Sequence, residues 1–581
     1  MNRFCRIIGK ALPVIQVIFI IIWLSNLART DAYFSIYSVI SFISFYVILK
    51  DVRQKVDKPD LLSGVISVFF SISVYLSNYP LFTTIGDSAV IGYSTSVMVN
   101  LINSVLSIAG GCFVSYPIIR WFFNFFPLDS WNGFSFERRP YLPFVIFSTV
   151  ALISLIHLFL VEYPGNITED PFTQISEMVS GSYSNFNTYW HTILFQFILS
   201  IGYSIFSDVN AAVALFCVIQ ALILAAAFTH ALMTMIDSDV PGIFVVVSYV
   251  IYAILPYNIA MGITIWKDVL FAAGCLLMLS SLYRIINGLN YNLFLNYITL
   301  FFGGLLFIIS RTNGWVILLV AFIASLPVLR HHLKVTLALV SLTFVGWFLL
   351  NPALSLLHVS GGDPVESMSV PIQQVSRVIA DGCVLTSEEE ELLNAVVDLD
   401  EVPNLYVNWL SDPMKVEVRS KDYAYFQDHL GDYAKLWVQL GMRYPWEYVK
   451  AWVDHTKGYW NAGYDYPLYS ETVTDNPYGV AKSGGGNPAA SLFRLYFGLS
   501  RHVIIFEPLH SIGLHVWIMI LCFLLNLKKG REGWILSLPL LVLVVGLWFG
   551  TPVYCSFRYV YPLFVCFPLL VSTSLFTVKK R

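Results

Sequence analysis

Long apolar stretches recur along the whole chain and restrict its fold more than any other feature. Three of them, 61–79, 141–161 and 209–235, are long enough to cross a bilayer, and only 12% of all residues are charged. A helix needs about 20 mainly apolar residues to span the hydrocarbon core, whereas soluble domains carry about 25% charged residues. The pattern predicts an all-α polytopic membrane protein with about 14 transmembrane helices.

Basic segments between these stretches predict the orientation of the chain. The positive-inside rule places Lys- and Arg-rich loops on the cytoplasmic side. The loop Leu527–Glu532 and the tail 578–581 are of this kind, so the long polar region 352–502 is expected outside. The polar loop 162–191 is also expected outside, but counting spans forward from it gives the opposite parity. We therefore expect the short stretch 192–206 not to cross the membrane.

The same pattern divides the chain into regions of a multi-pass cell-membrane protein. Thr386 and Ser387 are each followed three residues later by a Glu, which is the spacing of a capping box and predicts a helix start in the polar region. The expected regions are accessory transmembrane helices in 1–125, a transmembrane core in 141–351, a mainly helical extracytoplasmic domain in 352–502 and C-terminal transmembrane helices in 503–581.

The loop 162–191 holds the first candidate site residues. Glu169 and Asp170 form a carboxylate pair just outside an apolar stretch, where an acid can accept a proton or orient a cation. The alternative is a solvated acid that begins a helix over 171–180. Gln174 and His191 lie in the same loop, and His191 either anchors the next helix or binds a phosphate or hydroxyl group.

Charged residues beside apolar runs form the second set of candidates. Lys267 and Asp268 adjoin one such run, and Arg311 and Arg558 lie at the ends of others. Charges at these places are costly, so they tend to form ion pairs or mark a site, although a single cation is more often a membrane anchor. Three cations on one predicted face, beside an acidic loop, favour a site for a phosphorylated lipid with Asp268 in support.

Aromatic and metal-binding patterns are less specific. Trp452, Trp460 and Tyr464 either stack on sugar rings or form the core of a small helical domain. The eight cysteines form no CxxC pair, so no zinc site is expected, although Glu169 and Asp170 could contribute ligands to Mg²⁺ or Mn²⁺. A net charge of −3 gives no basic face for nucleic acid.

Six short segments, in their order along 141–577, resemble a known superfamily. They are YPGNITEDPFTQ, NTYWHT, WKDVLF, SRTNG, SVPIQQVSRV and FRYVYP. Together with the helix–loop–helix order, they resemble the GT-C glycosyltransferases, membrane enzymes that use polyprenyl-phosphate-linked sugars. The likeness is closer to an uncharacterised bacterial family of glycosyltransferase-like membrane proteins.

The resemblance implies a reaction and roles for the candidate residues. It implies transfer of a sugar from a polyprenyl-phosphate donor to a glycan, lipid or protein acceptor of the cell envelope, on the extracytoplasmic face. Asp170, with Glu169 beside it, would be the catalytic base, and Lys267, Arg311 and Arg558 would contact the donor phosphate. Members often carry a His-Pro-type pair where this chain has Tyr-Trp-His. The family pattern therefore does not assign a role to His191.

Two other functions fit the same sequence features. A transporter or flippase of lipid-linked sugars would share the phosphate-binding cations but would favour inverted repeats and broken helices. A non-catalytic scaffold for envelope assembly would use 352–502 as a docking module and would tolerate loss of Asp170.

Overall fold

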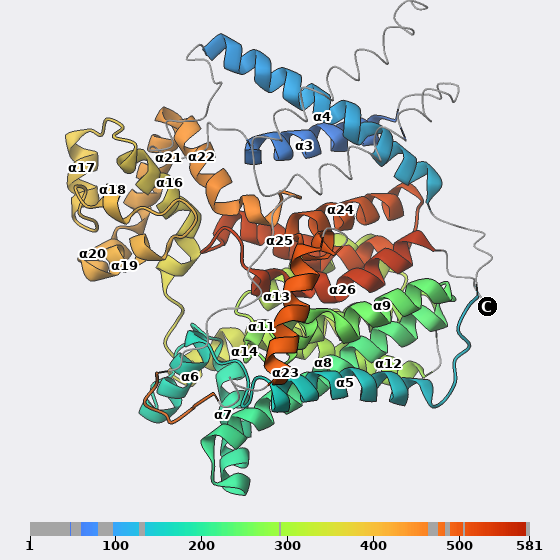
Figure 1. Cartoon of the computed structure of the whole chain (residues 1–581). Coiled ribbons are helices and arrows are strands. Elements are labelled where there is room, and N and C mark those ends of the chain that lie inside the picture. The colour runs from blue at the N-terminus through green and yellow to red at the C-terminus, as the bar shows by residue number, and fades with distance from the viewer. Residues whose placement is uncertain are drawn as a thin grey trace, which may run out of the picture.

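The computed structural model describes a helical protein (Figure 1). It describes residue 47 and residues 60–78, 97–126, 134–289, 292–462, 475–482, 488–503 and 506–576. In this part of the chain every regular element is a helix, with a few isolated bridges between loops. Within 1–125, where accessory transmembrane helices are expected, residues 1–46, 48–59 and 79–96 lie outside the described residues.

A bundle of apolar helices forms the body of the protein. Most of these helices are apolar on every side, as expected for segments surrounded by lipid and other helices. Side chains cap several of them; for example, Asp208 accepts a hydrogen bond from the Asn210 N–H at the start of α8. The bundle comprises α5 (Leu142–Leu160), α7 (Tyr189–Phe206), α8 (Val209–Asp237), α9 (Gly242–Ile254), α10 (Pro256–Gly262), α11 (Lys267–Ile286), α12 (Leu293–Ile309), α13 (Gly314–Leu329), α14 (Leu333–Leu350), α24 (Ile512–Lys528), η5 (Glu532–Ser537), α25 (Leu538–Gly550) and α26 (Phe557–Leu575).

Seven helices among the described residues are long and apolar enough to cross a membrane. The count becomes eight if α9 and α10, which meet at a bend of 48°, form one broken span. The chain is thus a helical membrane protein, but the expected number of about 14 spans is not reached in the described part. The predicted stretches of α12, α13 and α24 form helices of only 17, 16 and 17 residues, and α7 is not among the candidate spans.

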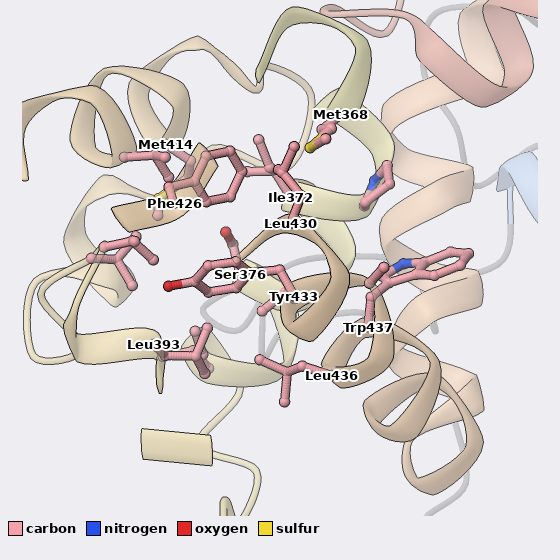
Figure 2. A pocket seen from close by; sticks show the side chains of 17 residues that line it. Met368, Ile372, Ser376, Leu393, Met414, Phe426, Leu430, Tyr433, Leu436 and Trp437 are labelled. Carbon is pink, nitrogen blue, oxygen red and sulfur yellow. The ribbon is translucent and has the colours of Figure 1, made fainter. Parts of the chain in front are cut away.

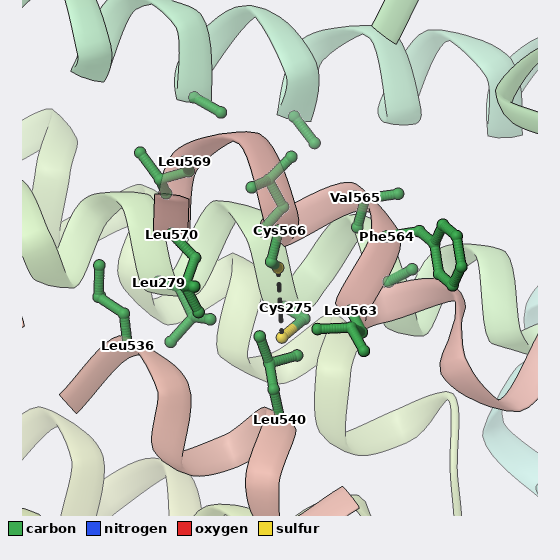
Figure 3. Packing of buried hydrophobic residues seen from close by; sticks show 14 of the residues in the cluster. Cys275, Leu279, Leu536, Leu540, Leu563, Phe564, Val565, Cys566, Leu569 and Leu570 are labelled. Atoms are coloured by element: carbon green, nitrogen blue, oxygen red, sulfur yellow. Dashed lines mark hydrogen bonds between the residues drawn. The ribbon is translucent and has the colours of Figure 1, made fainter. Parts of the chain in front are cut away.

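Helix α11 lies at the centre of the bundle and packs against α8, α12 and α26. Close approach to α12 depends on Gly274, where an added Cβ would lie 2.6 Å from the Phe307 backbone nitrogen. On the α26 side, the Cys566 and Cys275 sulfurs lie 3.9 Å apart among leucines of both helices (Figure 3). The first turn of α11, which carries Lys267 and Asp268, is therefore positioned by three neighbouring helices.

The polar region predicted as an extracytoplasmic domain contains a group of short helices around its own apolar core. These helices gather to one side of the bundle, on the left in Figure 1. The predicted capping box is confirmed for Thr386 and Glu389, whose side chains each bond to the other's backbone N–H. The helices are α15 (Pro352–Leu356), η2 (Pro364–Met368), α16 (Ser369–Ala380), α17 (Ser387–Asn394), α18 (Val402–Leu405), α19 (Asp412–Ser420), α20 (Tyr423–Asp428), α21 (Leu430–Arg443), α22 (Pro445–Thr456) and η3 (Lys457–Tyr459).

Four further helices flank these two parts. Helices α3 and α4 pack against each other, and α3 also contacts α22. Helix α23 runs across the outer ends of α9 and α10, where the Tyr496 hydroxyl bonds to the Ile254 carbonyl. Their bounds, with the short η4, are α3 (Leu61–Asn78), α4 (Val97–Phe125), α23 (Pro488–His502) and η4 (Glu507–His510).

Candidate functional site

The loop after α5 pairs with the link between α10 and α11. The Asn166 N–H donates to the Ile263 carbonyl (3.0 Å), and the Ile265 N–H donates to the Asn166 carbonyl (2.9 Å). The Trp266 indole N–H also donates to the Thr168 hydroxyl (2.7 Å). These bonds place the residues that follow Thr168 beside the first turn of α11.

A glycine permits this pairing. Gly165 has a φ of 131°, and a Cβ at this position would lie 2.4 Å from the Cys217 sulfur of α8. Any other residue would be strained in this backbone conformation and would displace Cys217.

The two loop acids occupy the first turn of α6 (Glu169–Ser180), the helix that was expected over 171–180. Glu169 is exposed and does not line the cavity described below, so its role beside the base stays a prediction that this geometry does not favour. The Asp170 side chain is partly buried, and its Oδ2 lies 2.7 Å from Nη1 of Arg558 in the first turn of α26. The pair joins residues that are 388 positions apart in the sequence.

Arg558 is held between aromatic rings. Its guanidinium carbon lies 5.5 Å from the ring centre of Trp266 and 4.9 Å from that of Tyr559. Such contacts orient the guanidinium while they leave some of its N–H groups free for other partners. Burial raises the pKa of Asp170, but the charges of Arg558 and Lys267 outweigh this effect, so the pKa lies below its usual value of 3.8. The Asp170 carboxyl is therefore ionised at neutral pH.

Arg311 forms a second ion pair close to the first. Its Nη1 lies 2.6 Å from Oδ1 of Asp268, a side chain that is 1% exposed. The guanidinium carbon of Arg311 lies 5.2 Å from the ring centre of Tyr559, which also contacts Arg558. Tyr559 thus contacts both arginines and links the two ion pairs.

Lys267 is the third cation of the site. Its ammonium group donates to the Asn187 side-chain oxygen (2.9 Å) and to the Phe186 carbonyl (3.4 Å). These partners are neutral, so Lys267 adds a positive charge that no carboxylate in hydrogen-bond contact balances within the described residues.

A cavity of about 650 Å³ opens onto all of these groups. Asp170, Lys267, Arg311 and Arg558 line it together, so four residues singled out in the sequence lie in one place. Its other walls come from the apolar face of α25 and from η2, which contributes Asp363 and Glu366.

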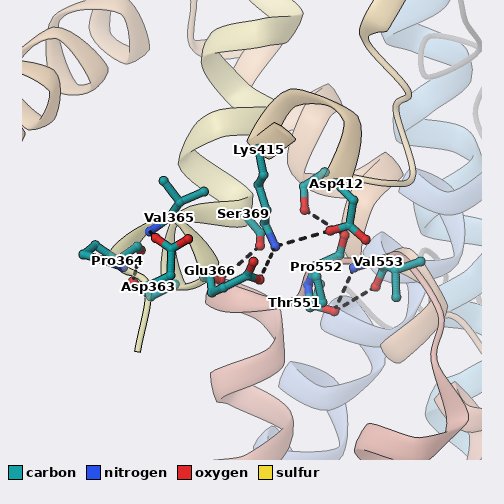
Figure 4. Close-up of polar contacts among 12 residues, drawn as sticks. Asp363, Pro364, Val365, Glu366, Ser369, Asp412, Lys415, Thr551, Pro552 and Val553 are labelled. Carbon is teal, nitrogen blue, oxygen red and sulfur yellow. Dashed lines mark hydrogen bonds and ion pairs between the residues drawn. The ribbon is translucent and has the colours of Figure 1, made fainter. Parts of the chain in front are cut away.

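Basic residues of α19 hold η2 against this cavity. The Lys415 ammonium lies 2.8 Å from Oε2 of Glu366 (Figure 4), and Arg419 pairs with both Glu366 and Asp363. The Ser411 hydroxyl, just before α19, donates to the Pro552 carbonyl between α25 and α26 (2.9 Å). The helical domain is therefore attached to the bundle at the rim of the cavity.

The predicted supporting residue Gln174, on α6, and the predicted phosphate-binding residue His191, on α7, contact each other. Gln174 donates through Nε2 to His191 Nδ1 (3.0 Å) and to the Thr192 hydroxyl (2.8 Å). His191 is 1% exposed and does not line the cavity, so its contact with a phosphate stays a prediction that this geometry does not favour. Its burial between α6 and α7 makes it a support for the helix that carries Asp170.

The aromatic residues predicted either to stack on sugars or to form a domain core make packing contacts where the structure describes them. Trp452 and Trp460 stack on each other with ring centres 5.5 Å apart, and Trp460 is 5% exposed. The Trp452 indole donates to the Trp548 carbonyl of α25 (2.8 Å). These two residues therefore help to join α22 to the bundle, which favours the packing alternative, and Tyr464 lies outside the described residues.

Sequence reasoning missed several residues around the cavity. Tyr559 follows Arg558 and Trp266 precedes Lys267. An aromatic residue next to a predicted cation was therefore a signal that could have identified them. Asn187, Asp363 and Glu366 lie in polar loops of ordinary composition, so nothing in the sequence distinguished them.

The residues at the cavity do not fit a divalent metal site. Glu169 does not line the cavity, Asp170 pairs with Arg558, and Asp268 pairs with Arg311. Among the described residues, no three His, Cys, Asp or Glu side chains gather in a way that could hold a metal ion.

Comparison with known proteins gives one match. The model of a family described as "Family of unknown function (DUF6020)" matches residues 180–580. The chain belongs to this family. The part matched in this DUF6020 protein includes Lys267, Arg311, Arg558 and the whole helical domain. No curated protein and no solved structure matches the chain.

Proposed function

We propose that the protein is a membrane glycosyltransferase of GT-C type. It would transfer a sugar from a polyprenyl-phosphate donor to a cell-envelope acceptor on the extracytoplasmic face. The observation that carries this proposal is the single cavity in which one carboxylate, Asp170, adjoins three cations. Lys267, Arg311 and Arg558 all lie at the first turn of an apolar helix or just before one, where charged side chains would be near a lipid headgroup if these helices cross the membrane.

The charges of the cavity suit displacement at a phosphate-linked sugar. Asp170 would accept the proton of an acceptor hydroxyl, and the oxygen of that hydroxyl would attack the anomeric carbon of the donor sugar. The bond from that carbon to the phosphate oxygen breaks, and the phosphate leaves with the electron pair. Fixed cations stabilise the charge that develops on the leaving group, and direct displacement inverts the anomeric carbon.

The pair between Arg558 and Asp170 gives this reaction a sequence of events. In the resting protein Arg558 keeps the pKa of Asp170 low, and a carboxylate with a low pKa is a weak base. A bound donor phosphate offers Arg558 a second anionic partner. When Arg558 turns to the phosphate, its contact with Asp170 weakens. Burial then raises the proton affinity of Asp170 at the time when the acceptor is in place.

Basic residues at the far ends of the helices support the proposed orientation. Arg138 and Arg284 both pair with Asp237 at the end of α8, and Lys528 pairs with Asp60 at the end of α24. Cytoplasmic loops are rich in such residues, so the opposite end, with the cavity and the helical domain, would face outward.

Sugar transfer in isolated membranes tests the proposal. A panel of radiolabelled polyprenyl-phosphate sugars is supplied to membranes that contain wild type, Asp170→Asn or Glu169→Gln at equal protein levels. We expect transfer with wild type and Glu169→Gln and a loss of about 10²-fold or more with Asp170→Asn.

The other outcomes separate the alternatives. Full transfer by Asp170→Asn would reject Asp170 as the base but keep the enzyme. No transfer with any donor, combined with movement of labelled lipid across vesicle membranes, would indicate a flippase instead.

A further inference from the structure

A second, chemically different pocket lies in the helical domain and is partly open at its surface, where the exposed Ala434 lines it. It has a volume of about 200 Å³ and lies between α16, α19, α20 and α21. Side chains of Ile372, Met414, Phe426 and Leu436 surround it (Figure 2). No charged residue lines it, in contrast to the cavity at α11.

A space of this size is unusual in the core of so small a domain. Protein cores pack with few voids larger than a water molecule, because an unfilled void deprives its lining of dispersion contacts. An engineered apolar cavity of about 150 Å³ remains dry and binds benzene or xenon. The pocket is therefore large enough to take an organic ligand and too apolar to be filled well by water.

One buried polar group faces this space without a partner. Ser376 of α16 is 3% exposed, and its hydroxyl forms no hydrogen bond with any residue that the structure describes. The other polar groups of the lining are occupied: the Tyr433 hydroxyl donates to the Leu392 carbonyl (2.9 Å), and the Trp437 indole donates to the Gln374 side-chain oxygen (2.8 Å). Ser376 is left to bond to a ligand.

The charged neighbour of Ser376 points elsewhere. Arg377 bonds to Asp381 (2.9 Å) and to Asp454 (3.1 Å), and Asp454 belongs to α22, outside the pocket. Without a cation in its lining, the pocket has nothing to balance the charge of a carboxylate or phosphate.

We propose that this pocket binds a neutral aliphatic molecule that carries one hydroxyl or carbonyl oxygen, which bonds to Ser376. Scaling from benzene in a cavity of about 150 Å³, the buried part of the ligand has about eight heavy atoms. This inference does not depend on the proposed glycosyltransferase activity.

Hydrogen exchange of the full-length protein in lipid nanodiscs tests the inference, with 1-octanol, octane and octanoate as probes. In wild type we expect 1-octanol to slow exchange in α16 and α21, octane to do so less, and octanoate to have no effect. Ser376→Ala weakens 1-octanol binding about fivefold, as the loss of one neutral hydrogen bond does, and leaves octane binding unchanged. Ser420→Ala, on the exposed side of α19 in the same domain, binds like wild type.

Two further variants keep the test independent of folding and of the bilayer. Ser376→Leu fills the pocket from inside, and Ala434→Trp blocks it from the exposed side of α21; both should abolish protection by 1-octanol. The inference is overturned if 1-octanol does not slow exchange in wild type. It is also overturned if Ala434→Trp retains the protection, because octanol would then act through the bilayer.

Discussion

The two cavities of this protein differ in how they are assembled. The cavity at α11 collects its charged groups from segments that lie up to 388 residues apart, and it pairs them across helices. The pocket of the helical domain is built from one stretch, 368–437, and is apolar apart from one hydroxyl. The first is organised by electrostatics and the second by packing, so mutations should affect them in different ways.

The largest effect is expected from removing a charge at the cavity near α11. Arg558→Met keeps much of the side-chain volume but removes the partner of Asp170 and one candidate phosphate ligand. We expect sugar transfer to fall about 10³-fold, because removing one preorganised group of this kind typically costs 10²–10³. Transfer kinetics in nanodiscs measure it, with Arg494→Met on the exposed face of α23 as control. A fall of less than tenfold would show that Arg558 has a structural role alone.

The next largest effect is a loss of stability from enlarging the apolar pocket of the helical domain. Leu436 lines the apolar pocket and is 3% exposed, so Leu436→Ala enlarges a space that already exists. We expect the helical domain to lose about 3 kcal/mol of stability, with little change in the rate per folded molecule. Pulse proteolysis in urea measures the stability, and Val438→Ala on the exposed side of the same helix is the control. Equal losses in both variants would contradict the role assigned to the pocket.

A smaller effect is expected at Asp268, which pairs with the cavity residue Arg311. Asp268→Asn preserves shape but removes the charge that holds Arg311. We expect transfer to fall about tenfold, since second-layer partners of this type commonly contribute 10- to 100-fold. A double-mutant cycle that combines Asp268→Asn with Arg311→Gln provides the check. If Asp268 only positions Arg311, the double variant should transfer sugar as fast as Arg311→Gln alone. Additive losses would mean that Asp268 acts by another route.

The smallest effect is a dependence of stability on pH. Asp170 has a lowered pKa in the folded protein, so its pair with Arg558 contributes stability above the usual pKa of 3.8 and loses it as pH falls through the lower, folded value. The difference in melting temperature between wild type and Arg558→Met should therefore be constant from neutral pH down to about the usual value and shrink below it. Asp170→Asn should remove this pH dependence, which separates it from that of other acids. A difference that persists unchanged at the lowest pH would contradict the ion pair.

The sequence revealed the charged cavity better than the apolar one for a physical reason. Lys267, Arg311 and Arg558 are conspicuous because charges next to apolar runs are costly and rare. The residues around Ser376 have the same composition as an ordinary core, and only their arrangement leaves a space. Pairings such as Arg558 with Asp170 were also beyond reach, because they depend on how distant helices pack.

The helix content was predictable, and the number of spans was not. Hydropathy identified nearly every apolar helix in the described part, but it does not specify where a helix bends or stops. The break between α9 and α10 and the short α12, α13 and α24 depend on tertiary packing. The roles of Trp452 and Trp460 could not be chosen from the sequence for a similar reason, because aromatic residues in this pattern suit either sugar stacking or the core of a small helical domain.

The charge balance of the wall at α11 has a consequence for its choice of ligand. Three cations face two carboxylates there, while the acids of η2 are matched by Lys415 and Arg419. The wall therefore carries one surplus positive charge, which a phosphodiester neutralises with its single negative charge. A diphosphate linkage would bring a second negative charge into a partly desolvated space with no counterion. If the cavity binds a lipid-linked donor as proposed, its charge balance favours lipids attached through one phosphate over lipids attached through two.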